Sequence, residues 1–253
     1  MSVAADSELA AQIAHQAGQL LLSVRSSGLT GKELGKAGDQ QSNEMILARL
    51  AVARPDDAVL SEESADSPAR LSADRVWIVD PLDGTREFGL PGRNDWAVHV
   101  ALWERSAIET NPSGLTASAV AQPALDAVYA TTAAAVVPPA VDRAPVILVS
   151  DSRPPAWAPE VAAAVGGVVQ PMGSAGAKAM AVGRGEADAY LHAGGQWEWD
   201  SAAPVGVLAA AGFHTSRIDG SPLLYNQAHP YLPDLVMCRP ELAAPLLAAL
   251  AGL

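Results

Sequence analysis

A short apolar strand that runs directly into two aspartates places the strongest constraint on this chain. Residues 76–79 (Val-Trp-Ile-Val) are β-branched or aromatic, which is typical of a buried strand. The next six residues, 80–85, read Asp-Pro-Leu-Asp-Gly-Thr. Pro81 removes a backbone donor, and Gly84 permits a tight turn. Asp80 and Asp83 at such a strand end can hold a hard cation such as Mg²⁺, which prefers oxygen ligands. The alternative is an ordinary turn whose aspartates bond to the backbone.

Composition describes a globular chain with an acidic surface. The 253 residues are 49% apolar and 17% charged, enough for one large domain or two ordinary ones. The net charge of −12 argues against polymeric nucleic acid or an anionic membrane as a partner. An anionic small molecule would therefore need local positive charge, which a metal cluster can supply.

The cysteine count and the N-terminus indicate a cytoplasmic protein. Cys238 is the one cysteine, so an internal disulfide is excluded and a reducing compartment is expected. It follows an apolar run, and we expect it to be buried. The N-terminus has no basic region before an apolar core, and no apolar run reaches about 18 residues. We therefore expect neither a signal peptide nor a membrane span.

The first half of the chain reads as α+β. An amphipathic helix is expected over 7–26, followed by a Gly- and Lys-rich loop to residue 38 and a second helix over 39–54. Strands are expected at 58–61, 76–79 and 96–103, and a β-hairpin over 117–131.

Strands and helices alternate in the second half, which predicts a layered α/β arrangement. The expected strands are 146–150, 168–170, 187–192, 213–217 and 234–238, and the expected helices are 157–165, 174–184, 200–211 and 240–252. Residues 132–145 between the halves shift to Ala, Val and Pro. We therefore divide the chain into an α+β metal-binding domain, 1–138, and an α/β substrate-side domain, 139–253.

Two further segments bring carboxylates to the same kind of position. Glu62 and Glu63 follow the strand at 58–61, and neighbouring strand ends would bring Glu62 close to Asp80. Adjacent strand residues face opposite ways, so one of the two glutamates should face the site. Asp200 precedes a long helix, and it can be a helix N-cap, part of a pocket wall, or both, since an N-cap aspartate is held rigidly at the positive helix end. Two tryptophans and a Gly-Gly pair directly before it favour the wall.

Four carboxylates from three segments, with the Thr85 hydroxyl beside them, form a coherent site for phosphoryl chemistry. Two metal ions about 3.5–4 Å apart can activate a water and stabilise the leaving oxygen in an in-line displacement on phosphorus. The N–H groups of Gly84 and Thr85 would bind phosphate oxygens, especially where a helix begins at Arg86.

Three motifs in this order resemble the signatures of the inositol monophosphatase superfamily, whose members are Mg²⁺-dependent, lithium-sensitive phosphatases. They are Leu-Ser-Glu-Glu (60–63), Trp-Ile-Val-Asp-Pro-Leu-Asp-Gly-Thr (77–85) and Trp-Asp-Ser-Ala-Ala (199–203). The Arg-Glu-Phe that follows Thr85 resembles the CysQ-type 3′(2′),5′-bisphosphate nucleotidases, and the segment 192–200 is similar to actinobacterial members. The resemblance implies a layered α/β/α/β/α sandwich with the site between the two halves.

The resemblance also implies a role for each motif position. Two or three Mg²⁺ ions would be held by Glu62, Asp80, the carbonyl of Leu82, Asp83 and Asp200. Thr85, Glu62 and Asp39 would activate water. Asp39 has an alternative as the N-cap of the second helix.

The implied substrate contacts are Gly84, Thr85, Arg86, Ser174 and Lys178. The segment Gly-Ser-Ala-Gly-Ala-Lys (173–178) resembles the substrate-binding Gly-Ser-x-x-Lys of bisphosphate nucleotidases, with one extra residue before the lysine. Solvent-exposed positions are the alternative for Lys178 and Arg86. His99 and His192 are either ligands or satisfied strand histidines. Trp197 and Trp199 either stack on a base or belong to the core.

The resulting expectation is a phosphatase that converts 3′-phosphoadenosine 5′-phosphate (PAP) to AMP by direct water attack, with the sulfonucleotide PAPS as a second substrate. The alternatives are the same chemistry on an inositol or fructose phosphate, a non-catalytic binding protein for phosphate ligands, and a pure interaction module. The family includes monomers and homodimers, and a homodimer is our expectation here.

Overall fold

One strand of the first sheet shows how the layers are built. In β2 (Arg75–Asp83), Val76 and Ile78 enter one hydrophobic cluster, and Trp77 and Val79 enter another. Successive side chains of a strand point to opposite faces of the sheet. A strand that is apolar on both faces must be covered on both, and in this protein helices cover each face.

The computed structural model describes residues 3–133, 136–140 and 142–253. Part of the segment at 132–145, which carries the expected domain boundary, lies outside the described residues (134, 135 and 141). The division at 138/139 stays a prediction.

Each half of the chain contributes one five-stranded sheet. The first sheet has the order β1-β2-β3-β4-β5, with β1 parallel to β2 and the remaining pairs antiparallel. Besides β2, its strands are β1 (Ala58–Ser61), β3 (Ala97–Glu104), β4 (Leu115–Gln122) and β5 (Ala127–Ala130). The second sheet is mixed and has the order β7-β6-β8-β10-β9. Its strands are β6 (Val146–Ser150), β7 (Val168–Met172), β8 (Ala189–Trp197), β9 (His214–Ser216) and β10 (Tyr231–Cys238).

Seven α-helices complete the described part of the chain. They are α1 (Val3–Arg25), α2 (Gly31–Ala53), α3 (Thr85–Phe88), α4 (Ala158–Ala164), α5 (Ala175–Gly183), α6 (Glu198–Ala210) and α7 (Pro240–Ala251). Short 3₁₀ helices lie at Pro68–Ser72, Arg105–Ala107, Pro123–Leu125 and Thr131–Ala133. None of the helices in these described segments is long and apolar enough to cross a membrane.

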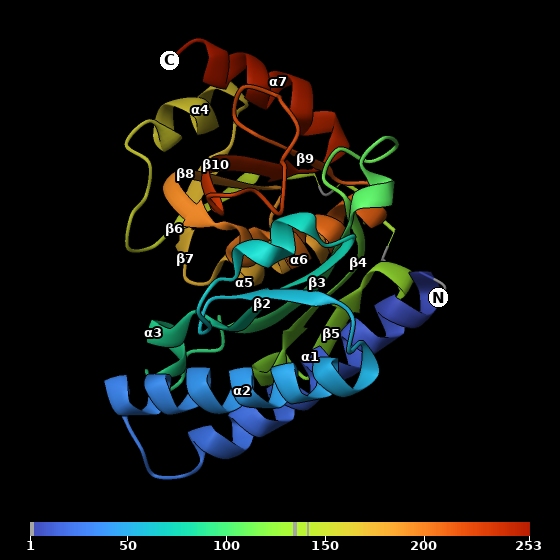
Figure 1. Cartoon of the computed structure of the whole chain (residues 1–253). Coiled ribbons are helices and arrows are strands. Elements are labelled where there is room, and N and C mark those ends of the chain that lie inside the picture. The colour runs from blue at the N-terminus through green and yellow to red at the C-terminus, as the bar shows by residue number, and fades with distance from the viewer. Residues whose placement is uncertain (1–2, 134–135, 141) are drawn as a thin grey trace.

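The elements stack in five layers (Figure 1). Helices α1 and α2 cover one face of the first sheet, α5 and α6 lie between the two sheets, and α4 and α7 cover the outer face of the second sheet. Three hydrophobic clusters fill the interfaces between these layers. The α/β/α/β/α sandwich expected from the sequence is confirmed. Cys238 is buried in the outermost of these clusters, as expected.

The expected loop between the first two helices exists but is shorter than predicted. It covers residues 26–30, and helix α2 begins at Gly31, so the Gly- and Lys-rich stretch from Gly31 onward is helical. Gly35 and Gly38 permit close packing instead of a turn. A Cβ atom at Gly35 would lie 2.7 Å from the Cγ2 methyl of Thr85. The missing side chain therefore lets the helix backbone approach the turn that follows β2.

Candidate active site

A β-bulge at the end of β2 turns both of its aspartates to the same face. Asp80 pairs with His99 of β3, and Asp83 pairs with Ala97, so three steps along β2 match two along β3. Residues three apart on a regular strand point to opposite faces of the sheet, but the extra residue of the bulge brings Asp80 and Asp83 back to the same face. Pro81, which cannot donate to the ladder, lies inside this irregular stretch. Asp80 and Asp83 consequently both face the helical layer between the sheets.

The pairing of β1 with β2 places Glu62 beside Asp80. The two strands are parallel with Ser61 opposite Val79, and the N–H of Glu62 donates to the carbonyl of Val79 at 3.3 Å. The Glu62 and Asp80 carboxyl groups are close enough to share a hydrogen bond. Glu63 borders a different hollow, next to Asp39. Glu62 therefore lies beside Asp80, and Glu63 lies on the side of Asp39 and Thr85.

Asp200 enters from the middle helical layer. It is the third residue of α6, and its Oδ2 accepts the N–H of Trp197 at 2.6 Å. Trp197 is the N-cap residue, so the alternative of Asp200 as N-cap is wrong, although Asp200 does stabilise the helix start from within. Trp197 and Trp199 stack with ring centroids 5.4 Å apart, and Trp197 keeps 41% of its surface exposed.

Carboxylate oxygens of Asp80, Asp83 and Asp200 lie within 4.8 Å of one another. Burial and the neighbouring charges of Glu62, Asp83 and Asp200 raise the pKa of Asp80 well above its ordinary value. Burial and the charge of Asp83 raise the pKa of Asp200 to about 6. Partial burial and the charges of Asp200, Asp39 and Glu63 raise the pKa of Glu62 to about 8, although its side chain reaches the surface. The cluster is therefore strained by like charge.

The pKa of Asp83 shifts in the opposite direction because groups at the start of α5 stabilise its ionised carboxylate. Its carboxylate accepts hydrogen bonds from the Ser174 hydroxyl, from the N–H of Ala175 at 3.1 Å and from the N–H of Gly176 at 2.6 Å. Burial alone would raise the pKa of Asp83, but His99, Ser174 and Lys178 lower it to about 2. Asp83 is thus held ionised at the positive end of a helix.

Ser174 adopts an unusual backbone conformation to make this contact. Its φ is +53°, a region that non-glycine residues rarely enter. The Ser174 Oγ accepts the N–H of Ala177 at 2.9 Å as the N-cap of α5, and its hydroxyl proton is donated to Asp83. The strain is concentrated at the point where the two sheets approach through the helical layer.

His99 is buried behind the aspartates. Its Nδ1 lies 3.1 Å from the carbonyl of Trp199, and its Nε2 lies 3.3 Å from Oδ2 of Asp83. The bond from Nδ1 to a main-chain carbonyl matches a satisfied strand histidine, whereas Nε2 has no hydrogen-bond partner among the described residues. His192 is also buried, with Nε2 at 3.0 Å from the carbonyl of Gly195.

Thr85 and Asp39 form a pair on the other side of the cluster. Thr85 Oγ1 lies 3.1 Å from Oδ1 of Asp39 and 3.1 Å from the carbonyl oxygen of Leu82. The single hydroxyl proton is donated to one acceptor at a time. Partial burial raises the pKa of Asp39 to about 7, against the effect of the Thr85 hydrogen bond. Asp39 lies inside α2, so the alternative of an N-cap is wrong.

The turn between β2 and α3 requires Gly84. Its φ is +83°, and a Cβ atom there would lie 3.0 Å from the carbonyl oxygen of Asp95 and 3.1 Å from Cβ of Ser174. A side chain at this position would be strained by the positive φ and would be too close to both of these atoms. The glycine therefore lets the two substrate-side segments, 84–86 and 173–178, lie against each other.

A cavity of about 210 Å³ opens beside the acidic cluster. Asp83 and Asp200 form part of its wall, and the cationic side chains of Arg86, Arg153 and Lys178 form another part. Tyr190, His192 and Gln196 from β8 also line it, and among the described residues Gln196 Nε2 is buried without a hydrogen-bond partner. These lining groups suit an anionic ligand with polar edges.

Lys178 is buried, so its expected alternative on the surface is wrong. It is 3% exposed, and its Nζ donates to the carbonyls of Ser174 at 2.6 Å and Met172 at 3.3 Å. The extra residue in the 173–178 segment is accommodated because the lysine lies on the first turn of α5. Burial lowers the pKa of Lys178 to about 8, against the carboxylates of Asp83 and Asp151.

Arg86 is both partly exposed to solvent and part of the cavity wall, so neither alternative alone describes it. Its side chain is 54% exposed, yet it lines the cavity and forms ion pairs with Glu87 at 2.8 Å and Asp151 at 2.6 Å. Asp151, Arg93 and Asp95 complete this charged group, and no sequence motif points to them. Their alternating signs are visible in the sequence, but Asp151 lies more than fifty residues from the others, and only the fold brings them together.

The donor set fits a divalent cation. Three carboxylates within 4.8 Å, together with Glu62 beside Asp80, provide the hard oxygen ligands that Mg²⁺ prefers. The pKa values of Glu62, Asp80 and Asp200 are raised in part by the charges of neighbouring carboxylates, and a cation would relieve that repulsion.

The fold and this acidic site define a member of a phosphatase family. The model of the inositol monophosphatase family matches residues 4–251, and the chain belongs to that family.

Relatives and solved structures agree with this assignment. The chain is 56% identical to a 3′-phosphoadenosine 5′-phosphate phosphatase of Mycobacterium bovis over 242 residues, 93% of this chain and 89% of the relative. It is 28% identical to a 3′(2′),5′-bisphosphate nucleotidase CysQ of Shigella flexneri, over 87% and 94% of the two chains. The structure of an inositol monophosphatase from Anabaena (Nostoc) sp. PCC 7120 superposes with a TM-score of 0.78 at 18% identity, covering 100% of this chain and 98% of that one.

Proposed function

We propose that this protein is a Mg²⁺-dependent phosphatase that removes the 3′-phosphate of PAP to give AMP and phosphate, with PAPS as a second substrate. The observation that carries the proposal is an acidic cluster that borders a cavity lined by Arg86, Arg153 and Lys178. One phosphate would react at the cluster, and a second anionic group on the same ligand would find cations in the cavity. The relative with 56% identity, which bears the name of this activity, supports the substrate assignment.

The residues that would hold the cations are Glu62, Asp80, Asp83 and Asp200, with the main-chain carbonyl of Leu82. Two or three Mg²⁺ ions, when bound, would supply positive charge against the phosphoryl oxygens and acidify water. The buried position of Asp83 and its hydrogen bonds to α5 keep that carboxylate ionised and fixed in direction.

Thr85 and Asp39 would handle the proton of the attacking water. When the Thr85 hydroxyl donates to Asp39, the lone pairs of its oxygen remain free to accept a hydrogen bond from water. Proton transfer then runs from water to the threonine oxygen and from the threonine hydroxyl to Asp39. A pKa of about 7 suits Asp39 to accept a proton near neutral pH. Glu62, at the mouth of the site, would orient the water.

The substrate contacts in this proposal are Gly84, Thr85, Arg86, Ser174 and Lys178. The backbone of the 84–85 turn would bind the reacting phosphate. Ser174 and Lys178 belong to the segment that borders both the cluster and the cavity. A role in sulfate assimilation and lithium sensitivity are parts of the proposal that the resemblance implies. A cytoplasmic location, expected from the composition of the sequence, and a homodimer are also parts of the proposal.

Phosphate release separates this function from its rivals. The purified protein is given PAP, inositol 1-phosphate and fructose 1,6-bisphosphate in separate reactions, each with Mg²⁺ or with a chelator. PAP hydrolysis well ahead of the two sugar phosphates supports the proposal. A preference for either sugar phosphate would leave the metal site and contradict the substrate, and no release from any compound would favour a non-catalytic binding protein.

A further inference from the structure

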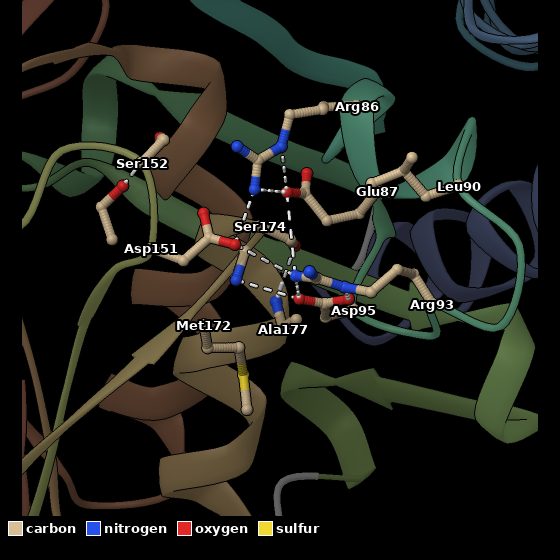
Figure 2. Close-up of polar contacts among 12 residues, drawn as sticks. Arg86, Glu87, Leu90, Arg93, Asp95, Asp151, Ser152, Met172, Ser174 and Ala177 are labelled. Atoms are coloured by element: carbon tan, nitrogen blue, oxygen red, sulfur yellow. Dashed lines mark hydrogen bonds and ion pairs between the residues drawn. The ribbon is translucent and has the colours of Figure 1, made fainter. Parts of the chain in front are cut away.

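Two arginines from one segment converge on a single oxygen of Asp151. Arg86 Nη2 lies 2.6 Å from Oδ2 of Asp151, and Arg93 Nη2 lies 3.2 Å from the same atom. Figure 2 shows both guanidinium groups directed at this carboxylate from the side of Glu87 and Asp95. Two guanidinium groups on one oxygen are an arrangement that suits phosphate as well as carboxylate.

Both arginines are held from behind by other carboxylates. Arg86 Nε donates to Oε1 of Glu87 at 2.8 Å, and Arg93 forms a two-point contact with Asp95, whose Nε–Oδ1 distance is 2.6 Å. Asp95 is in turn fixed by the N–H of Gly173, which donates to its Oδ2 at 2.9 Å. These contacts do not involve Asp151, so the two arginines would keep their positions without it.

Asp151 approaches from the other half of the chain. It follows β6 of the second sheet, whereas both arginines follow β2 of the first. Its side chain is 20% exposed and lines the cavity beside the acidic cluster. Its charge also acts on Lys178, across the same cavity, where it raises the pKa of the amine. A negative side chain thus lines the cavity, paired with Arg86, which also lines it, and with Arg93.

We propose that Asp151 is a specificity-determining residue that occupies an anion site made by Arg86 and Arg93, and that the 5′-phosphate of an adenine nucleotide displaces it. This inference rests on the proposed function for the choice of nucleotide. In the free protein the carboxylate keeps the two cations satisfied. In the complex, the phosphate takes the guanidinium donors and Asp151 turns to solvent, which its partial exposure permits.

This exchange weakens the binding of every ligand that uses the site, because the Asp151 carboxylate competes with the ligand for the two arginines. A phosphate group brings more negative charge and more acceptor oxygens than one carboxylate, so it wins the competition, but with reduced affinity. A neutral nucleoside gains nothing from displacing Asp151. Asp151 therefore sets how strongly the cavity discriminates between phosphorylated and unphosphorylated ligands.

Calorimetric binding of AMP and adenosine tests this exchange directly. Both are titrated in the presence of Mg²⁺ into the wild-type protein, Asp151→Asn, and a control variant, Glu109→Gln. The control removes the same unit of charge at an exposed residue that does not line the cavity. We expect Asp151→Asn to bind AMP about two- to fivefold more tightly than wild type, the scale of one exposed ion pair. Adenosine affinity should not change, and Glu109→Gln should match wild type.

The inference would be overturned if Asp151→Asn bound AMP no more tightly than the wild type, or if its affinity for adenosine rose by the same factor. It would also be overturned if neither the wild type nor Asp151→Asn bound AMP. A second variant, Arg86→Gln, should weaken AMP binding without affecting adenosine. The binding result is independent of turnover. If the wild type does not hydrolyse PAP but Asp151→Asn binds AMP more tightly, only the proposed function is refuted. If the wild type hydrolyses PAP but Asp151→Asn binds AMP as the wild type does, only the role of Asp151 is refuted.

Discussion

The backbone N–H of Gly176 donates to Oδ2 of Asp83 at 2.6 Å, which joins the end of a strand in the first sheet to the first turn of α5. Ser174 and Ala175 donate to the same carboxylate. Asp83 is thus both a candidate cation ligand and the residue that fixes the substrate-side helix on the acidic cluster. Removing the charge of Asp83 should therefore affect the stability of the protein differently from removing the charge of Asp200.

Substituting these two aspartates should have opposite effects on the stability of the metal-free protein. Asp83→Asn places an amide donor against three donors, and we expect a loss of about 2–3 kcal/mol in the free energy of unfolding, the scale of charged hydrogen bonds. Asp200→Asn removes a charge whose pKa is raised by burial and by Asp83. We therefore expect it to leave the melting temperature unchanged or higher. Both variants should lose phosphatase activity.

Thermal and denaturant melts in the presence of a chelator measure the difference. A control is Asp219→Asn, an exposed aspartate far from the cavity wall. An equal loss of stability in Asp83→Asn and Asp200→Asn would mean that the hydrogen bonds from α5 do not distinguish the two carboxylates.

The metal-free protein should lose stability as the pH rises from about 4 to about 8. The pKa values of Asp200 and Glu62 are raised to about 6 and about 8, and burial and neighbouring carboxylates raise the pKa of Asp80 well above its ordinary value. A group whose pKa is higher in the folded state stabilises the fold below its unfolded pKa, and this contribution is lost as the pH rises through its folded pKa. The sign for this acidic cluster is therefore a decrease with pH.

Mg²⁺ should reverse much of that loss, because a bound cation offsets the charge of the ionised carboxylates. The measurement is the melting temperature with Mg²⁺ minus that with a chelator, taken at several pH values. We expect this difference to be larger at pH 8 than at pH 5. A stabilisation by Mg²⁺ that is independent of pH would contradict the assignment of the cation site to these carboxylates.

The contact between Gly35 and Thr85 predicts a specific pair of variants. A Cβ atom at Gly35 would lie 2.7 Å from Cγ2 of Thr85, so Gly35→Ala should displace the Thr85 side chain from Asp39. We expect kcat to fall by about tenfold or more, since small displacements of catalytic groups are costly. Thr85→Ser removes the methyl group and keeps the hydroxyl.

The double variant Gly35→Ala/Thr85→Ser should therefore recover activity relative to Gly35→Ala alone. Initial rates with PAP for the wild type, both single variants and the double variant form the complete comparison. If the serine variant is active and the double variant is no better than Gly35→Ala, the loss arises from another effect of the added methyl group.

Lys178 should matter for binding more than for stability. Its amine is buried and its pKa is lowered to about 8, so ionising it is costly in the fold. We expect Lys178→Met to keep the melting temperature of the wild type and to raise KM for PAP about tenfold, with a smaller effect on inositol 1-phosphate. Melts and steady-state kinetics with both substrates measure this. A large drop in melting temperature with unchanged KM would assign Lys178 to structure alone.

Local patterns were sufficient for most strands and helices, whereas the five-layer arrangement was expected from the resemblance of three motifs to a family. The apolar run around Trp77 and the proline-interrupted acidic turn are readable from neighbouring residues. The helical start of α2 does not follow from the sequence because glycine lowers helix propensity. The close approach of Gly35 to Thr85 and of Gly38 to Leu82 and Phe88 explains why glycines stand there. The burial of Lys178 and the approach of Asp151 to Arg86 depend on how the second sheet lies against the first, which no local pattern encodes.

The central claim is that this site hydrolyses the 3′-phosphate of a nucleotide bisphosphate with a divalent cation. The most direct measurement is inorganic phosphate release from PAP, with AMP identified as the other product, in the presence of Mg²⁺ and again after chelation. The account predicts rapid release that chelation abolishes and that PAP supports well above inositol 1-phosphate. Release that survives chelation, or that favours inositol 1-phosphate, would contradict it.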